Sequence, residues 1–396
     1  MPERITVVGI GADGWAGLSE DARAAITAAG VVIGAPRHLE MLPAVDGQTR
    51  RSWPSQLRAG LPALFDGLAG PVVALASGDP LRSGVATTLI EVFGADAVTV
   101  FPALSSVTLA RARLGWSAES TAVIRAGDEH AVLRELAPGR RVLVLSADET
   151  TPARVAGLLV GRGYGASRMT VLGELGGDAE SRLDMTAETF TGAMPRLNIV
   201  ALELAGPPAF GWAPGLPDDA YDHDGQLTKR DLRASALARL APAPGQLLWD
   251  VGAGAGSVGI EWMRAHPTCR TVAVEANPDR AQRISNNARN LGVPALKVVR
   301  GAAPDALMDL PQPDAVFVGG GLSRPGVLSA CLAALRAGGR LVAHAVTLET
   351  EALLAQAYRE HGGELTRIQV EHAAPLGSFT GWKPARAVTQ WALTLP

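Results

Sequence analysis

Residues 247–259 read LLWDVGAGAGSVG, and this stretch decides the fold of the second half of the chain. A short apolar run ends in Asp250 and is followed by closely spaced glycines, after which we expect a helix. A strand, a glycine turn and a helix in this order bring a ligand close to the backbone beside a helix N-terminus. Gly254, Gly256 and Gly259 also fit the GxGxxG pattern of dinucleotide-binding proteins, which is a weak signal when it stands alone.

Three neighbouring features favour S-adenosylmethionine (SAM) over a dinucleotide. The carboxylate of Asp250 would repel a diphosphate, whereas a sulfonium amino acid would suit it. Glu275 ends the next expected strand and could accept both ribose hydroxyls, a feature that fits NAD equally well. Residues 301–304 (GAAP) and 314–321 (DAVFVGGG) are similar to the later loops of class I methyltransferases. The combination predicts a SAM site.

The same half alternates between expected strands and expected helices. The strands are residues 247–251, 271–275, 297–300, 315–318 and 340–345, and the helices are 229–240, 257–265, 278–291 and 325–335. This alternation predicts a parallel, Rossmann-like α/β sheet. Residues 364–370 and 387–395 lack a comparable helix between them, so we expect an antiparallel addition at the sheet edge.

The first half of the chain shows the same alternation. The expected strands are 5–10, 31–33, 72–76, 98–101, 121–124, 142–145, 169–172 and 198–204, with helices such as 19–29 and 151–162. We therefore predict two α/β subdomains that divide near residues 115–120. Residues 206–226 are rich in proline and glycine, which predicts a linker between two domains.

Composition limits the class of protein. The 396 residues suggest two or three domains at roughly 150 residues each. A chain that is 47% hydrophobic and 19% charged, with a net charge of −3, offers large cores and no basic footprint for nucleic acid. Its two cysteines exclude a disulfide framework, and no apolar run reaches the length of a membrane span. The N-terminus does not read as a signal peptide, so we expect a cytoplasmic protein.

The second half resembles a specific family. Its motifs are LTKRDLR (227–233), WDVGAGAGSVGIE (249–261), GAAPDAL (301–307), VFVGGG (316–321) and AVTLE (345–349). Over residues 226–396 they resemble the decarboxylating precorrin methyltransferase domain of cobalamin biosynthesis. The resemblance implies SAM contacts at Thr228, Gly252, Ala253, Gly254, Ala255, Gly256, Glu275 and Ala303. The cluster Lys229, Arg230 and Arg233 either begins an exposed helix or holds substrate carboxylates.

The first half contains a misleading match to the dinucleotide-binding pattern and resembles a second family. GIGADG (9–14) spells GxGxxG, but the second strand ends in Gly34 where NAD would require an acid. Residues 76–84 (ASGDPLRSG), 102–106 (PALSS) and 34–39 (GAPRHL) resemble the tetrapyrrole methylase superfamily, over residues 4–204. That superfamily holds SAM in a cleft between two subdomains, which implies contacts at Gly11, Gly78, Asp79, Ser83, Ser105 and Ser106. His38 could be a general base or a structural histidine.

Together the halves resemble the fused precorrin-6Y C-5,15-methyltransferases (decarboxylating) of aerobic cobalamin biosynthesis. The resemblance implies two SAM sites per chain and a tetrapyrrole substrate, precorrin-6B (precorrin-6Y). Residues 1–205 would methylate ring carbon 5, residues 206–226 would form the linker, and residues 227–396 would methylate carbon 15 and decarboxylate the carbon-12 acetate, giving precorrin-8X. We expect no metal, no nucleic-acid or membrane partner, and a homo-oligomer; no catalytic acid or base is identified.

Two other functions remain open on the sequence alone. One is a SAM methyltransferase that acts on another small molecule or on RNA. The other is a non-catalytic regulator that binds SAM or a tetrapyrrole.

Overall fold

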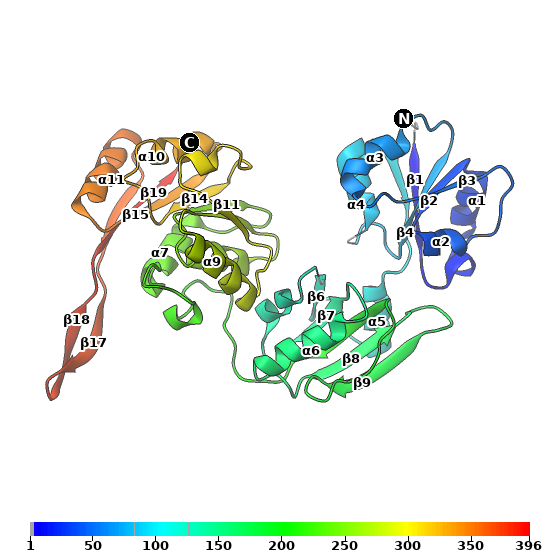
Figure 1. The fold of residues 1–396 in the computed structure, drawn as a ribbon, viewed down its shortest axis with the longest axis horizontal. Coiled ribbons are helices and arrows are strands. Elements are labelled where there is room, and N and C mark those ends of the chain that lie inside the picture. Colours follow the sequence, from blue (N-terminus) through cyan, green and yellow to red (C-terminus); the bar gives the residue numbers. More distant parts are fainter. Residues whose placement is uncertain (1–3, 83, 126) are drawn as a thin grey trace. The chain divides into compact units, whose positions relative to one another are not determined.

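The computed structural model describes residues 4–82, 84–125 and 127–396, which divide into two compact units. Unit 1 takes the chain as far as Glu129 and again Ala137–Pro207, and unit 2 takes His130–Leu136 and Pro208–Pro396. Figure 1 shows the helices and strands of both units.

Unit 1 begins with a five-stranded, fully parallel sheet in the order β3-β2-β4-β1-β5. Its strands are β1 (Ile5–Ile10), β2 (Val31–Gly34), β3 (Thr49–Ser52), β4 (Val72–Ser77) and β5 (Val98–Phe101). Its helices are α1 (Glu20–Ala28), α2 (Pro36–Glu40), α3 (Leu57–Phe65) and α4 (Val85–Phe93). Helices α1 and α2 cover one face and α3 and α4 the other (Figure 1), because alternate strand residues such as Val7 and Val8 belong to opposite cores.

The second sheet of unit 1 is mixed, in the order β6-β7-β10-β8-β9. Its strands are β6 (Thr121–Arg125), β7 (Arg141–Leu145), β8 (Arg168–Gly173), β9 (Ser181–Thr186) and β10 (Asn198–Glu203), with helices α5 (Ser106–Leu114) and α6 (Thr151–Gly161). The two predicted α/β subdomains are thus present. The predicted division is displaced, since α5 packs its buried Val107 and Ala110 on this second sheet. The division falls between β5 and α5, ahead of residues 115–120.

Unit 2 is built on a seven-stranded sheet in the order β13-β12-β11-β14-β15-β19-β16. Its strands are β11 (Leu247–Val251), β12 (Arg270–Glu275), β13 (Lys297–Arg300), β14 (Ala315–Val318), β15 (Arg340–Ala345), β16 (Glu364–Ile368) and β19 (Val388–Thr394). The first five are parallel, and β19 runs antiparallel to β15 and β16, which confirms the Rossmann-like sheet with its antiparallel edge.

Helices cover both faces of this sheet. They are α7 (Arg230–Leu240), α8 (Ser257–Ala265), α9 (Pro278–Asn290), α10 (Val327–Ala334) and α11 (Leu348–His361). Buried residues of α7, α8 and α9 share one core with the strands, and those of α10 and α11 share the other. Alternation along β11 explains this, because Leu248 faces one core and Trp249 the opposite one.

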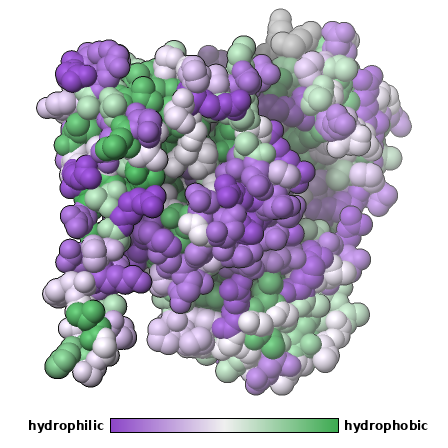
Figure 2. Space-filling model, turned by 60° about the vertical axis from the view of Figure 1, so that its left-hand side comes forward, coloured by the Kyte–Doolittle hydropathy of each residue, from purple (hydrophilic) through white to green (hydrophobic). Residues whose placement is uncertain are grey.

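A two-stranded hairpin in unit 2 was not predicted. It consists of β17 (Glu371–Leu376) and β18 (Phe379–Pro384), which pair only with each other. Leu376, Phe379 and Trp382 are 68%, 78% and 72% exposed. Figure 2 shows hydrophobic residues at the end of this hairpin, at lower left. Edge strands β3 and β9 were also missed, because their polar, mostly exposed residues lack an apolar pattern.

The segment predicted as a linker, residues 206–226, is largely built into unit 2. Leu216 and Tyr221 are only 4% exposed and belong to a core of that unit. The backbone N–H groups of Gly215 and Leu216 donate to the carboxylate of Glu261, at 2.6 and 3.0 Å. The Tyr221 hydroxyl donates to the same carboxylate at 2.9 Å. A buried carboxylate needs hydrogen-bond donors, and the bonds to Glu261 therefore hold this segment against α8.

Candidate functional site

Unit 2 contains a cavity of about 1090 Å³ at the carboxyl ends of its parallel strands. Its walls come from the loops that follow β11, β12, β13 and β14, from the start of α7, and from the end of β15 with the segments beside β16, β17 and β19. Open α/β sheets bind ligands at this edge. Of the residues predicted to contact SAM, six line the cavity: Thr228, Gly252, Ala253, Gly254, Glu275 and Ala303.

The glycine loop of this cavity is fixed by its backbone. Gly252 and Gly254 adopt φ angles of +66° and +59°, which disfavour residues with a Cβ. A Cβ at Gly252 would lie 2.6 Å from the backbone oxygen of Gly320, in the loop after β14. The two loops therefore approach each other closely, as the glycine run at residues 319–321 predicts.

Two residues of the predicted loop do not face the cavity. Ala255 is 1% exposed, and its carbonyl accepts a hydrogen bond from the Asn287 side chain at 3.0 Å. A Cβ at Gly256 would lie 2.7 Å from the Ile284 side chain on α9. Both residues seat helix α8 against α9, so any contribution they make to ligand binding is indirect.

Glu275 connects the loops around the cavity. Its Oε2 accepts from the Gly254 N–H at 2.8 Å, and its Oε1 accepts from the Asn277 N–H at 2.9 Å. The side chain is 7% exposed and lines the cavity. A carboxylate oxygen can accept more than one hydrogen bond, so Glu275 could still receive ribose hydroxyls. The structure adds a second role, which is to hold the glycine loop in place.

Asp250 does not face the ligand, contrary to the argument made from its charge. It is 1% exposed and does not line the cavity. Its Oδ2 accepts from the Gly259 N–H at 2.9 Å, in the first turn of α8. Burial raises the pKa of this carboxyl to about 7. Asp250 therefore anchors the helix to the strand beneath the loop.

The three basic residues at the start of α7 have different environments. Lys229 and Arg230 line the cavity, and Lys229 pairs with Asp218 at 3.6 Å. Arg233 is fully buried; its guanidinium pairs with Glu261 at 2.5 Å and with Asp218 at 3.3 Å. The expectation that Arg233 holds substrate carboxylates is therefore corrected. Its donors are used inside the unit.

Sequence reasoning missed three residues on the cavity wall. Arg324 follows β14, Arg386 precedes β19, and His344 lies on β15; none of the three belongs to the motifs from which the site was predicted. Within the described chain, neither Arg324 nor Arg386 has a carboxylate partner within ion-pair distance, and the same holds for Arg230. By contrast, Arg280 on the same wall pairs with Asp224 at 2.8 Å.

Unit 1 contains a cavity of about 980 Å³, lined by residues of both its sheets. Loops after three adjacent strands meet there: Gly11 follows β1, Gly78 follows β4 and Ser105 follows β5. Gly78 has a φ of +54°, and a Cβ on it would lie 2.9 Å from the Leu104 carbonyl oxygen. The structure brings Gly11, Gly78, Asp79, Ser105 and Ser106 together on this wall. Ser83 lies outside the described residues.

Side chains of these loops mostly support their own backbone. Asp79 Oδ1 accepts from the Leu81 N–H at 2.9 Å, which closes the turn of the loop. Ser105 caps helix α5 by accepting from the Thr108 N–H at 3.1 Å. The ligand-facing groups of these loops are therefore largely backbone atoms.

His38 lines the cavity of unit 1 but is 4% exposed. Its Nε2 lies 3.2 Å from the Ser77 hydroxyl, and Arg37 also donates to that hydroxyl, at 2.6 Å. Burial, and to a smaller extent the Arg37 charge, lowers the pKa of His38 to about 4. A neutral imidazole held in this way leaves both earlier interpretations open.

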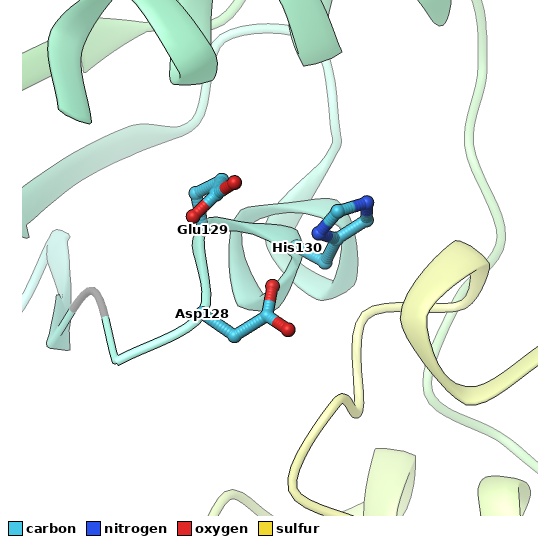
Figure 3. A group of neighbouring side chains, drawn as sticks. All are labelled: Asp128, Glu129 and His130. Carbon is cyan, nitrogen blue, oxygen red and sulfur yellow. The ribbon is translucent and has the colours of Figure 1, made fainter. Parts of the chain in front are cut away.

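One group of side chains has the spacing of metal ligands. Ligand atoms of Asp128, Glu129 and His130 lie within 4.8 Å of one another (Figure 3). They are consecutive residues at the start of a 3-10 turn, and Glu129 pairs with Arg154 at 3.2 Å. Asp128 and His130 have interactions of their own. These partners already account for the cluster, and it carries no metal assignment.

Two protein families match the chain, one largely within each unit. Residues 4–191 match the family described as Tetrapyrrole (Corrin/Porphyrin) Methylases. Residues 219–395 match the family described as Precorrin methyltransferase domain. The two matches place the chain among the methyltransferases of tetrapyrroles.

Individual relatives narrow the class. A Precorrin-6Y C(5,15)-methyltransferase (decarboxylating) from Sinorhizobium sp is 45% identical over 396 residues, 98% of this chain and 96% of the relative. The chain belongs to this family, the precorrin-6Y C(5,15)-methyltransferases (decarboxylating).

Two shorter relatives each match less than half of the chain. A Probable cobalt-precorrin-6B C(15)-methyltransferase (decarboxylating) from Pyrobaculum calidifontis is 34% identical over 189 residues, 45% of this chain and 96% of the relative. A Cobalt-precorrin-7 C(5)-methyltransferase from Salmonella typhimurium is 32% identical over 174 residues, 43% of this chain and 84% of the relative.

No helix within the described residues combines the length and the apolar character needed to cross a membrane.

Proposed function

We propose that the chain is a SAM-dependent enzyme that methylates precorrin-6B (precorrin-6Y) at ring carbons 5 and 15 and decarboxylates its carbon-12 acetate, giving precorrin-8X. The observation that carries this proposal is similarity along the whole chain to a protein named for these reactions. The same similarity favours this function over an RNA methyltransferase or a non-catalytic regulator.

We assign one SAM site to each unit. In unit 2, the wall that carries Gly252, Gly254 and Glu275 supplies close backbone and a carboxylate suited to ribose hydroxyls. In unit 1, the converging loops at Gly11, Gly78 and Ser105 supply the backbone surface. In both sites glycine lets neighbouring loops pack closely and leaves backbone groups on the cavity wall, since a Cβ at Gly252 or Gly78 would clash with the backbone of the adjacent loop. SAM, when bound, supplies a methyl group on a sulfonium leaving group.

The protein's contribution is mainly to position the reacting carbon. A tetrapyrrole with acetate and propionate side chains offers several carboxylates, which guanidinium groups bind in bidentate fashion. In unit 2 the guanidiniums of Arg230, Arg324 and Arg386, which have no carboxylate partner among the described residues, are available for them. In unit 1, Arg37, Arg82, Arg125 and Arg196 line the cavity. Correct orientation of two reactants can lower a barrier by about 7–11 kcal/mol.

We assign carbon-5 methylation to unit 1, and carbon-15 methylation with decarboxylation to unit 2. Two observations support this division. The family matched by residues 219–395 bears the name of a precorrin methyltransferase, and shorter relatives carry each of the two activities in a separate protein. The acetate on carbon 12 lies nearer carbon 15 than carbon 5, so one pocket can hold both centres.

The test uses the intact chain. Unit 2 contains His130–Leu136 as well as Pro208–Pro396, so a single cut after unit 1 would remove part of unit 2. Gly78→Ala should clash with the Leu104 carbonyl and displace the loops of the unit 1 cavity, and Gly252→Ala should do the same to the unit 2 cavity through the Gly320 backbone. Mass spectrometry and NMR with labelled substrate should find that wild type adds two methyl groups and releases carbon dioxide. Gly78→Ala should add one methyl at carbon 15 and release the gas, and Gly252→Ala should add one at carbon 5 and release none. Gas from Gly252→Ala would reverse the assignment.

We also propose that the chain forms a homo-oligomer in the cytoplasm. The hairpin β17–β18 supports self-association, because an isolated two-stranded sheet is marginally stable in water and this one exposes Leu376, Phe379 and Trp382. Light scattering should find more than one chain per particle. Replacement of Phe379 and Trp382 by Ser should shift the particle toward a monomer, and a monomeric wild type would contradict the proposal.

A further inference from the structure

One histidine on the cavity wall of unit 2 has a fixed hydrogen-bonding partner behind it. His344 on β15 lies directly opposite Gln390 on the antiparallel strand β19. Its Nε2 is 2.9 Å from the Gln390 side-chain amide, and its ring packs edge-on against Phe317 at 5.1 Å between ring centroids. Gln390 itself is fully buried.

The neighbours of Gln390 determine which way its amide points. With the oxygen turned toward α7, it accepts from Arg239 Nε at 3.1 Å, from Arg239 Nη1 at 3.3 Å and from the Ser235 hydroxyl at 3.3 Å. The opposite orientation would set the amide nitrogen against these guanidinium donors. Arg239 is held in turn by Glu364, at 2.5 Å. The amide nitrogen therefore faces His344.

This orientation determines the tautomer of His344. An amide nitrogen can only donate, so Nε2 of the imidazole must be the acceptor and its proton must lie on Nδ1. Burial lowers the pKa of His344 to about 4, which keeps the ring neutral at physiological pH. Nδ1 has no partner among the described residues and is not closed off from the cavity that His344 lines. It is thus a donor that a molecule in the cavity can reach.

The position on the sheet separates His344 from the residues assigned to SAM. Most of those residues follow β11, β12 and β13, whereas β15 lies on the other side of β14. The start of β19 adjoins the carboxyl end of β15 and brings Arg386, which lacks an acidic partner in the described chain, to the same part of the cavity. A neutral donor beside an unpaired guanidinium suits an anionic acceptor.

We propose that His344, held as the Nδ1–H tautomer by Gln390, donates a hydrogen bond to a carboxylate oxygen of the tetrapyrrole. This inference rests on the proposed function for the identity of the ligand. It assigns His344 to positioning the substrate and excludes it as a general base, because its only basic nitrogen is occupied.

The first test needs no substrate. Nitrogen-15 NMR of the intact chain, with the His344 signals assigned by their loss in His344→Asn, should show a neutral imidazole protonated on Nδ1 at pH 7. In Gln390→Glu the new carboxylate accepts from Nε2, so Nε2 should become protonated. An Nε2–H tautomer in wild type would overturn the proposal whatever the substrate is.

The second test measures turnover. His344→Leu should raise KM for the tetrapyrrole by about 10- to 100-fold, the effect of losing one hydrogen bond to a charged group. The affinity for S-adenosylhomocysteine (SAH) should not change. His344→Asn keeps a donor near the Nδ1 position and should stay within about threefold of wild type. His361→Asn, at the exposed last residue of α11, is the matched control.

The possible failures are distinguishable. An unchanged KM in His344→Leu would overturn the role in substrate binding even if the tautomer is as proposed. A wild type that does not methylate the precorrin at all would instead reject the proposed function.

Discussion

The two cavities are both lined by glycine turns, but different contacts hold these turns in place. In both units, glycine turns at the carboxyl ends of parallel strands bring backbone to the wall of the cavity. In unit 2 a single buried acid, Glu275, ties the glycine loop to the next strand, at 2.8 Å from Gly254. Close backbone packing is common to both units, since a Cβ at Gly9 would lie 2.2 Å from the Gly78 carbonyl oxygen in unit 1 and a Cβ at Gly252 would lie 2.6 Å from the Gly320 backbone oxygen in unit 2. The difference is that a buried acid joins separate loops in unit 2, whereas the acid of the unit 1 loop, Asp79, bonds within its own turn.

The largest expected effect separates stability from binding within unit 2. Arg233→Ala leaves Glu261 without its buried cation, and loss of one partner of such a pair costs about 3–5 kcal/mol. Hydrogen-exchange mass spectrometry should show this loss in the free energy of unfolding of unit 2 and no change in unit 1. Arg230→Ala, three residues away on the cavity wall, is the control and should cost less than about 0.5 kcal/mol. Equal losses would contradict the buried role of Arg233.

The next effect tests whether one acid dominates the unit 2 site. Glu275→Ala should weaken SAH binding there by about 1.5–3 kcal/mol, because a charged acceptor for ribose and for the Gly254 N–H is removed. Binding in unit 1 should be unchanged, as titration calorimetry can measure. If NADH bound the wild type tightly and SAH did not bind, the SAM assignment itself would fail.

A property that the two units share should appear as pH falls. His38 in unit 1 and His344 in unit 2 have pKa values lowered to about 4 by burial, against an ordinary value of 6.5. Between pH 6.5 and pH 4 the unfolded chain binds protons that the folded chain does not, so stability is present above this window and is lost as pH falls through it. Each histidine should contribute on the order of 2 kcal/mol.

Urea unfolding of His38→Asn and wild type, compared at pH 7 and pH 4.5, isolates the contribution of unit 1. The variant should lose less stability than wild type over this interval. An equal loss would mean that His38 becomes protonated in the folded state.

The smallest effect is expected at the acid of the unit 1 loop. Asp79 accepts one hydrogen bond from the Leu81 N–H and supports its own turn. Asp79→Ala should therefore weaken SAH binding in unit 1 by only about 0.5–1.5 kcal/mol, the range of one ordinary hydrogen bond. An effect as large as that of Glu275→Ala would show that unit 1 also depends on a single acid.

Local patterns predicted most of the fold, because apolar runs and glycine turns encode a strand, a turn and a helix within a few residues. The strand bounds at β11, β13, β14 and β15 follow directly from such runs. Polar edge strands β3 and β9 and the exposed hairpin β17–β18 carry no apolar pattern, so the sequence could not reveal them.

Side-chain direction was the part that sequence could not supply. Arg233 and Arg230 lie in one motif, yet only a carboxylate 28 positions further along the chain decides that Arg233 points inward. Asp250 was placed at the ligand by its charge, whereas the N–H of Gly259 draws it under the helix. The pairing of His344 with Gln390 joins residues 46 positions apart. Each of these depends on tertiary packing.

Titration calorimetry of the intact chain with S-adenosylhomocysteine is the most direct test of the central claim that each unit holds one SAM. Wild type should bind two molecules per chain. Gly252→Ala should bind one, since a Cβ at that position would lie 2.6 Å from the Gly320 backbone, while Gly211→Ala, where nothing lies within 4 Å of the new Cβ, should still bind two. A single site in the wild type would contradict the account and leave one cavity without a cofactor.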